Sequence, residues 1–72
     1  MEEFRQFLKT QTNLGERTIR VYLRVLKKFL AENELTIENM NAYIKRIPIA
    51  KFAFKHYLKF LGKEEYYNLL IK

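Results

Sequence analysis

The chain has 72 residues and a mass of 8.8 kDa, which limits it to one small domain over residues 1–72. Apolar residues make up 49% of the chain and charged residues 31%, a balance that excludes both a disordered tail and a membrane protein. Cysteine and aspartate are absent and there is one histidine, so the chain holds few groups for catalysis or metal binding. We therefore expect no enzymatic activity, no cofactor and no metal ion.

The first two helices are predicted from apolar residues that recur at helical spacing. A short amphipathic helix is expected from Glu2 to about Gln11, and residues 13–15 (Asn-Leu-Gly) end it. A longer helix is expected from Glu16 to about Asn33, with its apolar side chains on one continuous arc. Its five basic side chains fall within a complementary arc of roughly 100°. This separation predicts a helix with one buried side and one cationic side.

The third helix is expected from Ile37 to about Arg46, with Thr36 as its N-cap. A fourth helix is expected from Ile49 to Leu61. Pro48 lies between them and either closes the third helix or opens the first turn of the fourth.

Gly62 is a stop signal for the fourth helix, and the segment from Glu64 to Ile71 fits a last short helix. No segment alternates apolar and polar residues as a strand does. The fold class predicted from these patterns is all-α, a compact bundle of four to five helices.

The basic residues are distributed unevenly along the chain. Fourteen lysines and arginines against eight acids give a net charge of +6 and favour a polyanionic partner, either nucleic acid or an acidic membrane surface. No acid occurs from Arg17 to Ala31 or from Asn39 to Lys63. A solvated helix usually mixes both signs at i,i+4, so these two acid-free faces favour a polyanion contact over a merely solvated surface. In the fourth helix the face is a row with the period of four residues: Lys51, Lys55, Lys59 and Lys63.

A peripheral membrane partner is the least favoured alternative, because the apolar faces of the helices are needed for the core, and a membrane span is not expected. Uninterrupted apolar runs stop at three residues, far short of the ~18 that a membrane span needs. The N-terminus carries Glu2 and Glu3 where a secretory signal would carry lysines, so export is not expected either.

Aromatic residues outside the apolar faces leave alternatives open. Phe52 falls on the polar side of the fourth helix, so it either packs on the first helix or the C-terminal segment, or contacts a partner. His56 lies at the edge of the lysine row without a carboxylate near it, which favours a surface histidine over a catalytic one. Tyr66 and Tyr67 have no activating cluster and are expected to be packing residues.

Three segments in succession resemble the N-terminal core-binding domain of tyrosine recombinases (phage integrases). Residues 14–30 resemble its Thr-x3-Tyr-x6-Phe-Leu pattern, with Thr18, Tyr22, Phe29 and Leu30 at the matching positions. Residues 35–44 resemble the next helix of that domain. Residues 53–61 resemble its Ala-Leu-Arg-x-Phe-Tyr-x-Phe-Leu helix, and the resemblance covers nearly the whole chain in the right order.

The resemblance implies a SAM-like orthogonal bundle that clamps double-stranded DNA through its second and fourth helices, in a cytoplasmic, nucleoid-associated protein of a prokaryote or virus. It further implies a recombinase catalytic domain or sister protomers as partners. The family's catalytic Arg/Lys/His/Arg set and nucleophilic tyrosine belong to a separate C-terminal domain, so neither His56 nor Tyr66 takes those roles. The connection around Lys45 to Ile49 is shorter than usual for the family, which argues against base-reading by this loop.

The sequence thus predicts a DNA-binding module of an integrase-like recombinase, and the alternative is a helical domain for protein–protein interaction through Phe52, Tyr66 and Tyr67. The candidate DNA contacts are Arg17, Thr18, Arg20, Arg24, Lys27, Lys28, Lys51, Lys55 and Lys59.

Overall fold

The computed structural model describes residues 1–70 and is all-α over that range, as predicted. In chain order its elements are α1 (Glu2–Gln11), α2 (Glu16–Glu32), α3 (Ile37–Arg46), α4 (Ala50–Phe60) and a 3₁₀-helix, η1 (Glu64–Leu69). The first four predicted helices are therefore confirmed to within one residue at each end. The last segment is a 3₁₀-helix, and the part of the predicted helix at Ile71 lies outside the described residues.

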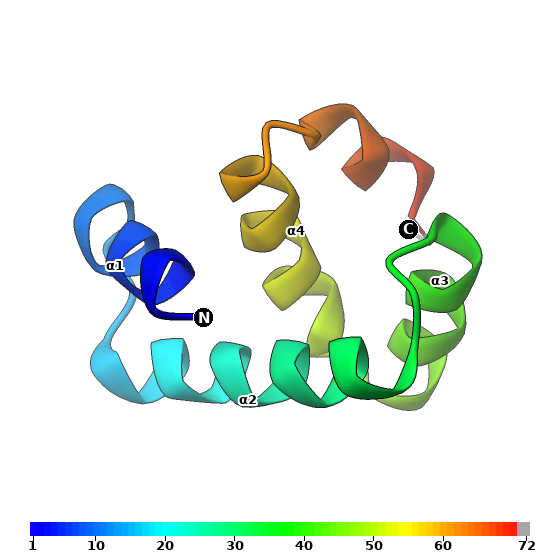
Figure 1. Ribbon diagram of the computed structural model, residues 1–72, viewed down its shortest axis with the longest axis horizontal. Helices are drawn as coiled ribbons and strands as arrows, with labels where there is room; N and C mark the ends of the chain where they lie inside the picture. Colours follow the sequence, from blue (N-terminus) through cyan, green and yellow to red (C-terminus); the bar gives the residue numbers. More distant parts are fainter. Residues whose placement is uncertain (71–72) are drawn as a thin grey trace.

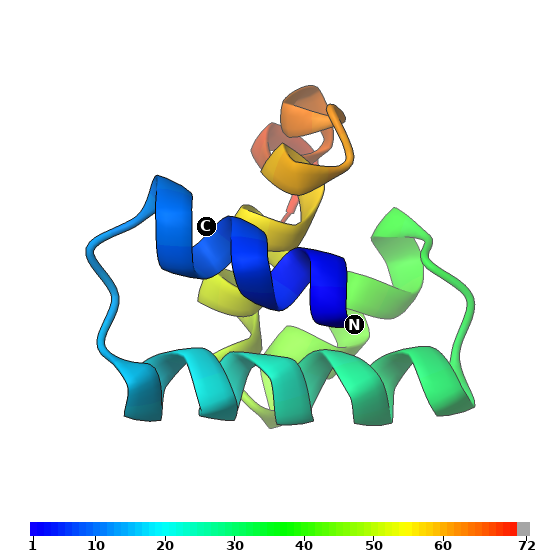
Figure 2. The ribbon, with the colours of Figure 1, turned by 60° about the vertical axis from the view of Figure 1, so that its left-hand side comes forward.

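α4 is the central element of the bundle. α2 forms the long base, and α4 rises steeply from it between α1 and α3, as Figures 1 and 2 show. α4 contacts each of the other four elements, with its largest contact to α2. The orientation of every basic face is therefore set by how the other elements pack on α4.

Aromatic contacts hold α4 in place on both of its sides. The Phe29 ring of α2 lies 4.8 Å from Phe54 of α4 and 5.1 Å from Tyr43 of α3, both in edge-to-face geometry. On the other side the Phe4 ring of α1 lies 5.1 Å from Tyr57 of α4. Such pairs add about 0.5–1.5 kcal/mol each beyond their burial. The largest fully buried side chains of these helices are Phe4, Leu8, Leu26, Phe29, Met40, Phe54 and Leu58.

The α2–α3 and α3–α4 junctions follow from local chemistry. The Thr36 hydroxyl accepts a hydrogen bond from the Asn39 backbone N–H at 3.1 Å, so the predicted N-cap of α3 is confirmed. Pro48 opens α4 rather than closing α3, because its carbonyl accepts the Lys51 N–H at 3.1 Å in the turn that leads into the helix.

α4 ends at a glycine, as predicted. Gly62 has φ of +74°, a left-handed conformation that other residues rarely adopt. Its N–H donates to the Lys59 carbonyl, and the Lys63 N–H donates to the Leu58 carbonyl at 2.8 Å, which is a Schellman motif. The motif reverses the chain, so Lys63 leaves the helix. The prediction that Lys63 continues the lysine row is therefore wrong.

Candidate nucleic-acid interface

The outer side of α2 carries five cationic side chains, which we call the α2 basic face: Arg17, Arg20, Arg24, Lys27 and Lys28. All five are exposed. They lie opposite the side of α2 that buries Ile19, Tyr22, Leu26 and Phe29 in the core. From the first to the last the face extends about 16 Å along the helix at 1.5 Å per residue. One strand of B-DNA carries a phosphate every 3.4 Å of helix axis, so a face of this length can reach several phosphates.

Two glutamates lie near this face, and both are held by other side chains. The Glu16 carboxylate pairs with Arg5 of α1 at 3.5 Å. Glu2 lines a shallow hollow with Arg24 and Lys27, but its carboxylate accepts a hydrogen bond from the Gln6 amide at 3.0 Å and lies 3.7 Å from Arg5. The hydrogen bond from Gln6 is the main reason that the pKa of Glu2 is lowered; desolvation opposes it, and the Arg5 and Lys9 charges add to the lowering. Both carboxylates therefore lie at the border of the α2 basic face, and both have partners outside it.

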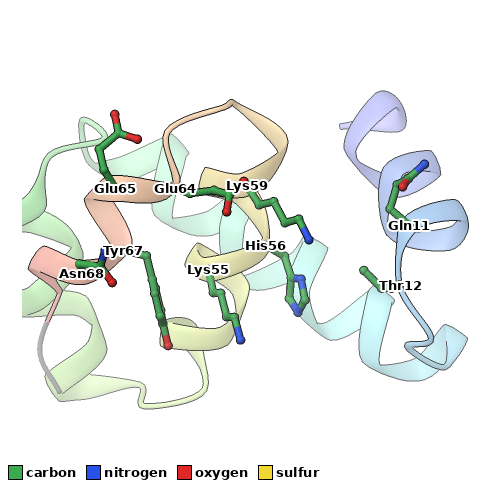
Figure 3. Close-up of a pocket in the computed structure, with 9 residues that line it drawn as sticks. All are labelled: Gln11, Thr12, Lys55, His56, Lys59, Glu64, Glu65, Tyr67 and Asn68. Carbon is green, nitrogen blue, oxygen red and sulfur yellow. The ribbon is translucent and has the colours of Figure 1, made fainter.

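The lysines of α4 have different surroundings. Lys55 and Lys59 are exposed and line a hollow of about 500 Å³ between the C-terminal end of α1 and η1 (Figure 3). Glu64 and Glu65 of η1 line the same hollow. The Nζ atom of Lys55 lies 5.8 Å from the centre of the Tyr67 ring, within the range of a cation–π contact.

The lysine row has no acid within its own stretch of sequence, as expected, but in the folded protein two glutamates of η1 border the same hollow. The Schellman turn at Gly62 folds η1 back toward α4, and this brings Glu64 and Glu65 to the border of the hollow that Lys55 and Lys59 line. Lys51, the first lysine of the row, is half-buried. The α4 lysines therefore form a weaker positive surface than the α2 basic face.

Thr18 lies half-buried on the flank of α2, toward its apolar side. No side chain caps the start of this helix, where Gly15 is the N-cap, so Thr18 does not take a capping role. Thr18 remains a candidate contact only at the margin of the α2 basic face.

Three hollows are bordered by five of the nine candidate residues. Arg24 and Lys27 border the hollow beside the start of α1, and Lys28 borders another that also contains Arg46 of α3. Lys55 and Lys59 border the third. None of these three hollows is bordered by candidate residues of both α2 and α4. The structure also adds Arg46 to the candidates, because this residue of α3 borders the same hollow as Lys28, which no spacing within one helix could reveal.

His56 connects the two candidate helices. Its ring stacks on the buried Tyr22 ring of α2 at 5.7 Å with an interplanar angle of 27°. Burial lowers the pKa of His56 below 6.5, and the neighbouring Lys55 and Lys59 charges lower it further. The imidazole is therefore neutral at pH 7. Within residues 1–70, no three histidine or carboxylate side chains gather closely enough to hold a metal ion.

This lowered pKa predicts a pH dependence of stability. The unfolded chain takes up the His56 proton more readily than the folded protein does, so this contribution to stability is present above about pH 6.5 and is lost as the pH falls through the folded pKa. We expect the urea concentration at the unfolding midpoint to decrease when the pH is lowered from about 7.5 to about 5.5, and to decrease less in His56→Gln. Equal pH dependence in the two proteins would contradict this assignment.

Comparisons with protein-family models, curated proteins and solved structures find no match to this chain. No helix within residues 1–70 has both the length and the apolar content to cross a bilayer.

Proposed function

We propose that this domain binds duplex DNA, with the α2 basic face as its principal contact and the α4 lysines as a second, weaker one. The observation that carries the proposal is the exposure of five cations on one side of α2, opposite its buried side, with no acid between Arg17 and Lys28 in the sequence. Lysine and arginine at this density bind phosphates and release the counterions condensed on DNA. The proposal assigns binding and no catalytic step.

An anionic membrane surface fits these features less well. A helix that lies on a membrane inserts its apolar face between the lipids. The apolar side of α2 is already committed to the core through Ile19, Tyr22, Leu26 and Phe29. The α2 basic face could attract an anionic membrane by its charge, but it has no apolar side chains to insert between the lipids. Contacts with DNA phosphates require only the charge.

Protein–protein interaction through Phe52, Tyr66 and Tyr67 is also less well supported. Tyr67 is half-buried and has the Lys55 ammonium over its ring, and the Lys63 Nζ lies 5.6 Å from the centre of the Tyr66 ring. Two of the three rings therefore lie under cations instead of forming a free apolar patch.

At a finer level we propose that the domain is the core-binding domain of a tyrosine recombinase. The order of the three resembling segments supports this proposal, as does the position of α2 and α4 as the two helices with basic faces. Only residues 47–49 separate α3 from α4, which leaves little chain for a base-reading loop. The reading frame that follows Lys72 in the source genome tests the finer proposal, since the resemblance implies a catalytic domain there.

The salt dependence of DNA binding tests the general proposal. If four to eight phosphates are neutralised, the logarithm of the association constant should fall with the logarithm of the salt concentration with a slope of roughly −4 to −7. Fluorescence anisotropy of a labelled mixed-sequence duplex measures this slope between low and moderate salt. An affinity that stays constant over that range, or no binding at low salt, would rule out the phosphate mechanism.

A further inference from the structure

Phe52 is an exposed aromatic residue in a cationic setting. Its side chain is 52% exposed, so the expectation that it packs on the first helix or the C-terminal segment is wrong. A single exposed apolar side chain is ordinary by itself. The position of Phe52 is the notable feature, because 100° per residue places it about 20° from Lys59 and about 60° from Lys55 on the outer side of α4. This side of the helix is opposite the buried Ala53 and Phe54.

The dimensions of DNA decide which groove such a helix can enter. An α-helix with its side chains is about 10–12 Å across, which matches the major groove at about 12 Å and exceeds the minor groove at about 6 Å. On the helix surface Phe52 lies next to Lys59, at the edge of the lysine row, so with Lys55 and Lys59 on the phosphates of one strand its side chain would reach base edges in the major groove. The large apolar group displayed there is the C5-methyl of thymine.

We propose that Phe52 is a specificity-determining residue that contacts thymine C5-methyl groups in the major groove of duplex DNA. This inference rests on the proposed function, since it requires α4 to lie against a duplex. It assigns different tasks to neighbouring residues: Lys55 and Lys59 bind phosphates of any sequence, whereas Phe52 favours A·T pairs over pairs without the methyl group.

The test removes the methyl group from the DNA and the ring from the protein in turn. The probes are a labelled duplex of A·T pairs and the same duplex with uracil in place of every thymine, so that the register of the protein does not matter. Burial of one methyl group corresponds to about a threefold to fourfold change in affinity. We expect the wild-type protein to prefer the thymine duplex by this factor and Phe52→Ala to lose the preference, with the salt slope unchanged because no charge is removed.

Two controls separate this effect from general weakening. Leu69→Ala removes another exposed apolar side chain, 61% exposed on η1, and should keep the thymine preference. A G·C duplex with 5-methylcytosine carries the methyl group at the same groove position, and wild type should prefer it to unmethylated DNA. Circular dichroism should show unchanged helicity in Phe52→Ala, because alanine has the higher helix propensity.

The outcomes distinguish this inference from the proposed function. If wild type binds duplex DNA with the expected salt slope but does not distinguish thymine from uracil, the Phe52 assignment is wrong and the proposed function stands. The same holds if Phe52→Ala weakens binding equally to both duplexes, or if the preference appears only on single strands, where Phe52 would stack on bases. Failure of wild type to bind any duplex overturns both.

Discussion

The double substitution Arg20→Glu and Arg24→Glu is expected to lower the affinity for duplex DNA by about a hundredfold at low salt. Both side chains are exposed near the middle of the α2 basic face, so the change replaces two cations by two anions without touching the core. The salt slope should also become shallower, by about one for each phosphate contact that is lost. Anisotropy titrations at several salt concentrations measure both quantities.

Single charge reversals at other sites serve as controls for the loss of DNA affinity expected from the α2 substitutions. Lys9→Glu makes the same kind of charge change at an exposed site in the last turn of α1, which is not part of the α2 basic face, and should have a small effect. Lys55→Glu should have an intermediate effect, because Glu64 and Glu65 already border the hollow that this lysine lines. If Lys9→Glu weakens binding as much as Arg24→Glu does, only net charge matters and α2 is not a specific contact surface.

Phe29→Ala is expected to have the largest effect on stability. Phe29 is fully buried and its ring contacts both Phe54 and Tyr43, so it joins α2 to α4 and α3. Loss of a buried phenylalanine side chain costs about 3–5 kcal/mol through lost burial and the cavity left behind. At about 0.05–0.15 kcal/mol per residue the whole domain has a stability of about 4–11 kcal/mol. The variant should therefore be partly or wholly unfolded at 37 °C.

Urea and thermal unfolding followed by circular dichroism measure this loss. Phe29→Leu keeps most of the apolar volume and should cost much less. Phe52→Ala removes the same kind of ring from an exposed site, so it should leave the unfolding midpoint nearly unchanged. A loss below about 1 kcal/mol for Phe29→Ala would mean that α2 does not pack on α4 through this ring.

Much of the local structure could be predicted from single segments of the sequence. The apolar period of residues 16–32 predicts both the length of α2 and its buried side, because each residue turns a helix by a constant angle. Thr36 and Gly62 mark helix ends because a hydroxyl cap and a left-handed turn are local chemistry. The 3₁₀ form of η1 could not be predicted in this way, since its six residues are too few to show a clear period.

The surroundings of the candidate site depended on contacts between segments. Sequence spacing placed Lys63 in line with Lys59, but the reversal at Gly62 removes it from the helix and brings Glu64 and Glu65 to the border of the hollow that Lys55 and Lys59 line. The neighbours of Lys28 likewise follow from the packing of α3 beside α2, which puts Arg46 at the same hollow.

For this protein the sequence by itself determined the helices, their buried sides and the cationic side of α2, because helical periodicity relates residues that are close along the chain. The tertiary structure alone decided which acids border the hollows beside the cations of α2 and α4, and that Phe52 is exposed. These features depend on how α4 packs against every other element, and that packing is set by contacts between residues far apart in the chain.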